Sequence, residues 1–187
     1  VYVCTWTSEH PRLVAAAAER GLAVFCEKPL GVDLAAAQTM TEVVEQAGVV
    51  NQVGLVLRHS PAFGLLKAIA EDERSGRPMS IVFRDDQYIP IQGMYASSWR
   101  GDVDKAGAGT LLEHSIHDLD MLEHVLGPVA EVSARIAGFH EIPGIEDVAT
   151  LALRFESGAI GTLTSIWHDV LERPSLRRVE LFCERAY

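Results

Sequence analysis

The segment Ala23-Val24-Phe25-Cys26-Glu27-Lys28-Pro29 decides the fold, because a short apolar run ends there in two charged residues and a proline. Such a run, bounded by residues that break regular structure, is typical of a buried strand. Stretches with helical composition flank it at residues 11–20 and 32–46, and further apolar runs lie at residues 1–4 and 49–57. Strands that alternate with helices across short, glycine-terminated links predict a parallel sheet with right-handed crossovers.

The pattern changes after Arg58, where strands begin to dominate. Two more helices are predicted, over residues 62–74 and 109–126. The predicted strands cover residues 80–89, 129–140, 147–155, 159–167 and 178–183. A tight link between two alternating runs near residue 157 predicts a hairpin and therefore an antiparallel sheet. We expect an α/β protein with a parallel domain at residues 1–57 and an α+β domain with a largely antiparallel sheet at residues 58–187.

The composition excludes several classes of function. The chain has 187 residues, of which 48% are hydrophobic and 22% charged, as in a globular protein. A net charge of −10, with scattered lysines and arginines, disfavours binding to nucleic acid or to an anionic membrane. No stretch approaches the ~18 apolar residues of a membrane-spanning helix. The cysteines, Cys4, Cys26 and Cys183, lack metal-ligand spacing and predict reduced thiols in a cytoplasmic protein.

Polar side chains form one stripe along the helix predicted over residues 109–126. Its members are Glu113, His117, Asp120 and His124. At about 100° per residue they fall within about 60° of one another, whereas leucines cover most of the opposite side. A stripe without lysine or arginine suits a cavity better than bulk water, although a solvated face and a metal site are alternatives. A carboxylate one turn from a histidine can orient the ring as a general base requires. Asp118 points away from the stripe and is expected at the surface.

The tripeptide Glu27-Lys28-Pro29 gains meaning from its position. Open α/β sheets bind ligands at the carboxyl ends of their strands, and this tripeptide follows a predicted strand. Pro29 restricts Lys28 to extended geometry and so fixes the direction of the ammonium group. Taken alone, the ordinary explanation of Lys28 is a surface lysine that precedes a helix.

Together these motifs resemble the Gfo/Idh/MocA family of NAD- or NADP-dependent oxidoreductases, which includes glucose–fructose oxidoreductase and inositol dehydrogenase. The resemblance covers nearly the whole chain. It is carried by Val3-Cys4-Thr5 through His10, Glu27-Lys28-Pro29, Gly54-Leu55-Val56-Leu57-Arg58 with Pro61, Trp99-Arg100, and the spacing Glu113-x-x-x-His117-x-x-Asp120. It implies that residues 1–57 are the C-terminal half of a Rossmann domain and that residues 58–187 form a substrate domain, incomplete at its C-terminus. It also implies a homo-oligomer assembled through the C-terminal sheet.

The resemblance assigns roles to individual residues. Lys28 would be catalytic, His117 would accept the proton of the substrate hydroxyl, and Glu113 would bind substrate or orient His117. The implied cofactor-binding residues are Thr5, His10, Glu27, Lys28 and Pro29. The implied substrate-binding residues are Arg58, Trp99, Arg100 and Asp120, with a structural ion pair as the alternative for either arginine. No resident metal is expected.

Several positions depart from the family pattern. Trp6 replaces the usual proline, Gly107-Ala108-Gly109 replaces a glycine triplet, and Glu113 replaces an aspartate. His114 and Ser115 stand where the family favours an aliphatic residue and glycine. No GxGxxG occurs in the sequence, so we expect a piece of a longer enzyme that binds the cofactor poorly by itself. The residue that reads the ribose 2′ position is expected outside this sequence, so the cofactor is NAD or NADP.

The predicted function is hydride transfer between NAD(P) and a secondary alcohol of a sugar, polyol or related small molecule. The first alternative is a redox-neutral, NAD-dependent enzyme of the same fold that cleaves a glycosidic bond. The second is a non-catalytic sensor of NAD(P) or sugar, and the third is a metal hydrolase built on the polar stripe.

Overall fold

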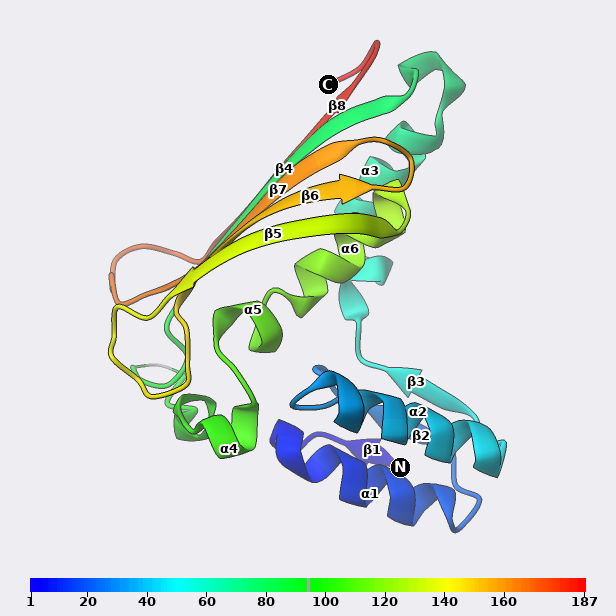
Figure 1. Ribbon diagram of the computed structural model, residues 1–187, viewed down its shortest axis with the longest axis vertical. Coiled ribbons are helices and arrows are strands. Elements are labelled where there is room, and N and C mark those ends of the chain that lie inside the picture. The colour runs from blue at the N-terminus through cyan, green and yellow to red at the C-terminus, as the bar shows by residue number, and fades with distance from the viewer. Residues whose placement is uncertain (94) are drawn as a thin grey trace.

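The computed structural model describes residues 1–93 and 95–187, and it contains a three-stranded and a five-stranded sheet. Figure 1 shows the smaller sheet with helices α1 and α2 at one end of the molecule and the larger sheet with helices α3 and α6 at the other. The fold class predicted from the sequence is therefore confirmed. In the described part of the chain, no helix has the length and apolar character needed to cross a bilayer.

The smaller sheet is parallel, as predicted. Its strands are β1 (Tyr2–Val3), β2 (Val24–Cys26) and β3 (Asn51–Val53), and its connecting helices are α1 (His10–Ala18) and α2 (Leu34–Ala47). Asp33 caps the start of helix α2, where its carboxylate accepts a hydrogen bond from the Ala36 amide at 2.8 Å, and Gly48 caps the end in a left-handed conformation. Val3, Val24 and Met40 belong to the core between the sheet and its helices.

The third strand is shorter than predicted. Strand β3 ends at Val53, and a short helix, η2 (Val56–His59), follows it. A Cβ atom on Gly54 would lie 3.0 Å from the Glu27 carboxylate, so the chain passes very close to Glu27 as it leaves the sheet. The apolar run continues beyond the strand because Leu57 packs against the core of the larger sheet.

The larger sheet has the strand order β5-β6-β7-β4-β8. Its strands are β4 (Pro78–Tyr88), β5 (Val129–Ala137), β6 (Val148–Phe155), β7 (Ile160–His168) and β8 (Leu176–Cys183). All neighbours are antiparallel except β4 and β7. Helices α3 (Pro61–Glu71) and α6 (Ile116–Leu126) cover one face, where Phe63 of α3 stacks on Phe83 of β4 at 6.1 Å between ring centroids.

The single helix predicted over residues 109–126 is wrong, because the structure divides it. Helix α5 (Thr110–Glu113) ends before His114, and α6 begins at Ile116. The hydroxyls of Thr110 and Ser115 lie 2.7 and 2.6 Å from that of Ser165 on β7, and all three residues are fully buried. These hydrogen bonds anchor the break to the sheet, so a tertiary contact interrupts the helical pattern.

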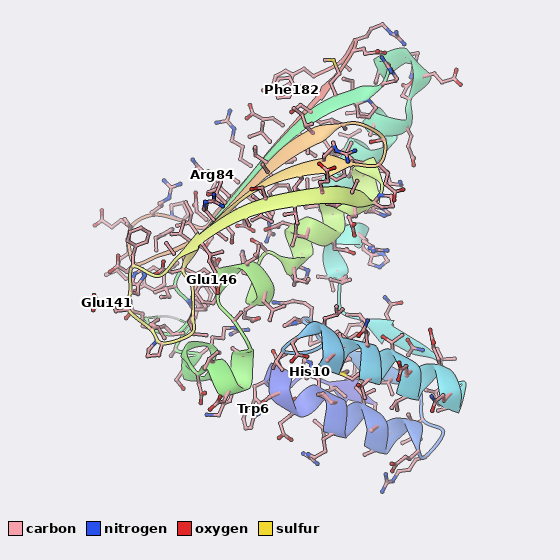
Figure 2. All side chains as sticks on the ribbon, viewed as in Figure 1. Trp6, His10, Arg84, Glu141, Glu146 and Phe182 are labelled. Carbon is pink, nitrogen blue, oxygen red and sulfur yellow. The ribbon has the colours of Figure 1, made fainter. Side chains whose placement is uncertain are left out.

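Glu146, in the loop between β5 and β6, holds the start of α5 (Figure 2). Its carboxylate accepts hydrogen bonds from the Gly109 amide at 2.7 Å and from the Leu111 amide at 2.9 Å. Its backbone carbonyl accepts a third bond, from the Thr110 amide at 2.9 Å. The chain approaches Glu146 so closely that a Cβ atom on Gly109 would overlap the carbonyl oxygen of Glu146. This position therefore requires glycine.

We expect Gly109→Ala to lower the free energy of unfolding by about 3 kcal/mol or more, because the added methyl collides with backbone rather than with a movable side chain. Urea unfolding followed by circular dichroism measures the change. Gly64→Ala in helix α3 is the matched control, since its Cβ would meet nothing within 4 Å. That control should stabilise the protein by about 0.5–1 kcal/mol. Equal unfolding midpoints for the wild type and Gly109→Ala would contradict the prediction.

Candidate active site

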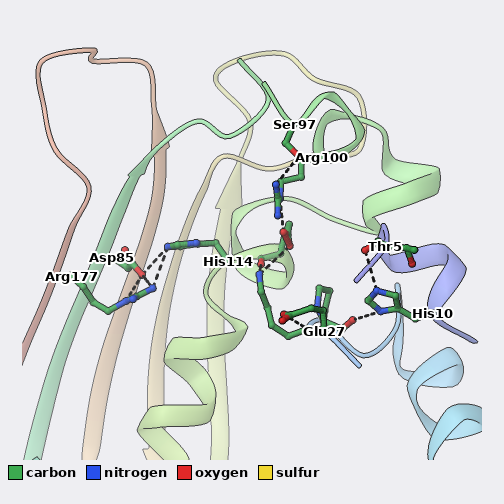
Figure 3. A network of polar contacts seen from close by, with 11 residues as sticks. Thr5, His10, Glu27, Asp85, Ser97, Arg100, His114 and Arg177 are labelled. Carbon is green, nitrogen blue, oxygen red and sulfur yellow. Dashed lines mark hydrogen bonds and ion pairs between the residues drawn. The ribbon is translucent and has the colours of Figure 1, made fainter. Parts of the chain in front are cut away.

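Lys28 and Glu113, which are 85 positions apart in the sequence, are in direct contact. Figure 3 shows the network of polar contacts around them. Lys28 follows strand β2, and its Nζ donates to the backbone carbonyl of Glu113 and lies 3.3 Å from the Glu113 Oε2 atom. The Nε atom of Arg100 donates to the other carboxylate oxygen at 2.6 Å. Glu113 is only 2% exposed, so its buried charge is neutralised by two cations from separate segments. This trio also fixes the Lys28 ammonium group in space.

Two cavities share the trio as a common wall. The first, here called the sheet-end cavity, has a volume of about 470 Å³ and lies at the carboxyl ends of β1 and β2. Its other lining residues are Cys4, Thr5, Trp6, Glu27 and Trp99. The second, here called the histidine cavity, has a volume of about 380 Å³. Its other lining residues are Leu57, Gln87, Pro90, Tyr95, His114, His117, Trp167 and Arg177.

His117 supplies a neutral imidazole to the histidine cavity. Burial, followed by the positive charge of Lys28, lowers the pKa of His117 to about 4. Its Nδ1 atom is buried and has no hydrogen-bond partner among the described residues. Burial also lowers the pKa of Lys28, although the carboxylate of Glu113 opposes that shift. A neutral imidazole that lines a cavity can accept a proton.

The predicted cofactor residues differ in position: some line the sheet-end cavity, and His10 is buried. Thr5, Glu27 and Lys28 line the sheet-end cavity. His10 is 1% exposed, and its ring nitrogens lie 3.0 Å from the Pro29 carbonyl and 3.2 Å from the Thr5 carbonyl. The ring therefore ties together the loops that follow β1 and β2, as Figure 3 shows. Cofactor contact by any of these residues stays a prediction.

The predicted polar stripe is split between two places. Glu113 and His117 line the histidine cavity, whereas His124 lines a separate hollow. The Asp120 carboxylate pairs with the guanidinium of Arg58, with Nε and Oδ2 2.9 Å apart. Within residues 1–93 and 95–187, no group of three His, Cys, Asp or Glu side chains is arranged to hold a metal. Substrate binding by Arg58 or Asp120 stays a prediction.

The other predicted substrate residues, Trp99 and Arg100, are neighbours at the sheet-end cavity. The Arg100 guanidinium lies over the Trp99 ring, 4.6 Å from its centroid, and donates to the Ser97 hydroxyl at 2.7 Å. Because Arg100 also binds Glu113, its geometry is determined by three partners. Both residues are positioned at the boundary of a cavity, but their contact with substrate stays a prediction.

Asp118 is fully buried, so its predicted surface position is wrong. Its Oδ1 atom lies 3.0 Å from Arg177 Nε, which donates at 2.7 Å to Asp85, a buried residue of β4. Burial, followed by the negative charge of Asp85, raises the pKa of Asp118 to about 7. The sequence pattern of β4 could have indicated the buried position of Asp85. Ile81 and Phe83 alternate toward the core, and Asp85 takes the next core-facing position.

The raised pKa of Asp118 predicts how the free energy of unfolding depends on pH. The folded state holds the proton of Asp118 more tightly than the unfolded state, so this carboxyl lowers the unfolding free energy as pH rises from about 4 through about 7. Asp118→Asn removes the titration. The variant should gain stability relative to the wild type between about pH 5 and about pH 8. Urea unfolding at both pH values tests this, with exposed Asp104→Asn as control. Parallel pH dependences for the wild type and Asp118→Asn would contradict the assignment.

Comparisons with known proteins cover both parts of the chain. A family described as an oxidoreductase family with an NAD-binding Rossmann fold matches residues 1–55, and the GFO/IDH/MocA C-terminal domain matches residues 63–187. Myo-inositol 2-dehydrogenase of Thermotoga maritima is 35% identical over 170 residues, which are 87% of this chain and 48% of that protein. The 1,5-anhydro-D-fructose reductase of Ensifer adhaerens is 33% identical over 164 residues, which are 86% of this chain and 48% of that protein. The chain thus spans about half the length of these relatives.

Solved structures show the same fold. A probable dehydrogenase from Thermotoga maritima is 31% identical, with a TM-score of 0.82, over 100% of this chain and 55% of that one. Levoglucosan dehydrogenase, solved in complex with NADH and levoglucosan, is 26% identical with a TM-score of 0.87 over 98% of this chain and 51% of that one.

Proposed function

Because the chain belongs to the Gfo/Idh/MocA oxidoreductase family, we propose that it supplies the catalytic residues of an NAD(P)-dependent dehydrogenase that acts on a secondary alcohol of a sugar or polyol. One observation carries this proposal. The trio of Lys28, Glu113 and Arg100 separates a cavity at the strand ends from a cavity that contains His117. This arrangement supports the proposal, because a cofactor in one cavity and an alcohol in the other would both lie beside the Lys28 ammonium group, and the alcohol would share its cavity with the neutral imidazole of His117.

The residues of the sheet-end cavity fit the nicotinamide end of NAD(P). Two indole rings, Trp6 and Trp99, offer flat apolar faces, and Thr5 and Glu27 offer polar groups at the carboxyl ends of the parallel strands. When bound, the nicotinamide supplies the hydride acceptor. Trp6, at the position where the family usually has proline, adds an aromatic face to this cavity.

The chain's own residues divide the work of proton transfer. His117 accepts the hydroxyl proton through its neutral ring, and Lys28 stabilises the negative charge that develops on the substrate oxygen. Glu113 and Arg100 hold Lys28 in place. Because Glu113 is engaged by both cations, we assign it the positioning of Lys28 rather than of His117.

An oxidation assay tests the proposal. The full-length protein should reduce NAD⁺ or NADP⁺ in the presence of myo-inositol, scyllo-inositol, levoglucosan or 1,5-anhydro-D-glucitol, followed by the absorbance of the reduced nicotinamide. Formation of reduced nicotinamide with at least one of these polyols supports the assignment as a dehydrogenase. Substrate turnover without net formation of reduced nicotinamide would favour the redox-neutral alternative.

We further place the domain boundary between Leu57 and Arg58.

We also propose that the protein is located in the cytoplasm and that it forms a homo-oligomer. Three free cysteines support a reducing compartment. The edge strand β5 exposes Val132 and Ile136 to 61% and 63%, which supports an interface on the larger sheet. Analytical ultracentrifugation of Val132→Lys beside the wild type tests the interface.

A further inference from the structure

A second histidine lines the histidine cavity, and a buried carboxylate orients it. His114 lies at the break between α5 and α6, and its Nε2 atom is 2.9 Å from Oδ2 of Asp85 (Figure 3). Asp85 projects from β4 and is only 2% exposed. The Nδ1 atom of His114 has no hydrogen-bond partner among the described residues. The residue thus joins a buried acid to an open cavity.

The carboxylate determines which nitrogen of His114 carries the proton. Nε2 of His114 also lies 3.4 Å from Nη2 of Arg177, which can only donate, but the Asp85 carboxylate is the nearer partner at 2.9 Å. In the neutral ring, Nε2–H therefore donates to Asp85, and Nδ1 keeps a free lone pair. A histidine held in one tautomer by an acid is the arrangement of a general base. Among the residues that the structure describes, no carboxylate holds His117 in this way, and Asp120 is bound to Arg58. The cavity therefore contains two imidazoles that are held by different means.

Arg177 and Asp118 support the acid behind His114. Arg177 Nε donates to Asp85 at 2.7 Å and lies 3.0 Å from Asp118 Oδ1. Burial raises the pKa of Asp85, but its contacts with His114 and Arg177 outweigh that effect and keep the pKa below its ordinary value. Asp85 is therefore the ionised member of the acidic pair, as an acid that orients a histidine needs to be.

We propose that His114, oriented by Asp85, is a second general base of the cavity, which removes a proton from the carbon adjacent to the carbonyl of the oxidised substrate. This inference rests on the proposed function. Oxidation of the alcohol uses one acceptor for the hydroxyl proton, and His117 supplies it. The resulting ketone has acidic hydrogens on its neighbouring carbons, and these give the second base a proton to remove.

The step balances without any added reagent. The carbon–hydrogen bond breaks, its proton moves to Nδ1 of His114, and its electron pair forms a carbon–carbon double bond. The carbonyl oxygen becomes an enolate oxygen, whose charge the Lys28 ammonium can stabilise. Return of the proton from Nδ1 restores the ketone, so the step is reversible.

Deuterium exchange tests the step. The full-length protein is incubated in D₂O with NAD⁺ and either myo-inositol or levoglucosan, and deuterium on the carbons beside the reacting carbon is measured by NMR. His114→Gln keeps an N–H donor for Asp85 but removes the base. We expect this variant to lower exchange per hydride transfer by about 10²-fold or more, a ratio in which any change of the hydride transfer rate itself cancels. Exchange per hydride transfer equal to that of the wild type would overturn the inference.

A second measurement needs no turnover. Nitrogen-15 NMR of the histidine rings should show His114 as the Nε2–H tautomer, and Asp85→Asn should change that signal while that of His117 moves less. A wild-type His114 with its proton on Nδ1 would overturn the inference, because the lone pair would then face Asp85. Absence of hydride transfer from every polyol contradicts the proposed function and this step with it. Hydride transfer without exchange contradicts this step alone and leaves the cluster as an anchor for the helix break.

Discussion

Replacing His117 with alanine is expected to lower kcat of the full-length protein by about 10²–10⁴-fold, with cofactor affinity nearly unchanged. The imidazole lines the histidine cavity, and its Nδ1 atom has no protein partner among the described residues. Its loss removes the acceptor for the hydroxyl proton without removing any contact in the sheet-end cavity. Steady-state oxidation of myo-inositol and cofactor titration by fluorescence measure the two quantities, with exposed His59→Ala as the control.

The pH dependence gives an independent check on His117. Because the pKa of His117 is lowered to about 4, the ring is neutral above that value and is lost as a base only as pH falls through it. The acid limb of kcat/KM for the wild type should therefore lie well below the ordinary range of histidine. Wild-type turnover by His117→Ala, or an acid limb that the substitution leaves in place, would contradict the assignment.

Replacing Lys28 with methionine is expected to lower kcat by a similar factor of about 10²–10⁴, because methionine fills the same space but cannot stabilise an alkoxide. A second effect follows from the electrostatics. The charge of Lys28 is one cause of the lowered pKa of His117, so removing it should shift the acid limb to higher pH. Lys67→Met is the matched control, because Lys67 binds Glu71 and the His124 carbonyl away from both cavities.

The kinetic pattern distinguishes the possible roles of Lys28. A change confined to KM would mean that Lys28 binds ground state and transition state equally and does not stabilise charge in the reaction. An unshifted acid limb would mean that Lys28 and His117 are not coupled in the working enzyme. Folding of the variant is checked by its unfolding midpoint, since Lys28→Met leaves the buried Glu113 with Arg100 as its remaining cation.

Local patterns in the sequence determined the order of strands and helices and the direction of the first sheet. Glu27-Lys28-Pro29 was located at the carboxyl end of a strand by the same reasoning, and the structure places Lys28 there. These predictions succeed because hydrophobic periodicity and glycine or proline stops act between neighbours along the chain. The motif spacing also identified Glu113 and His117, which the structure brings to one cavity with Lys28.

Tertiary contacts decided what periodicity could not show. The helix breaks at His114 because Ser115 and Thr110 bond to Ser165, a residue 50 positions from Ser115. Asp118 is buried because Asp85 and Arg177, from two strands of the larger sheet, meet it there. Asp120 leaves the predicted stripe because Arg58 binds it. Each outcome depends on a partner distant in sequence, and a residue's own neighbours carry no information about the charge or hydroxyl that the fold will place beside it.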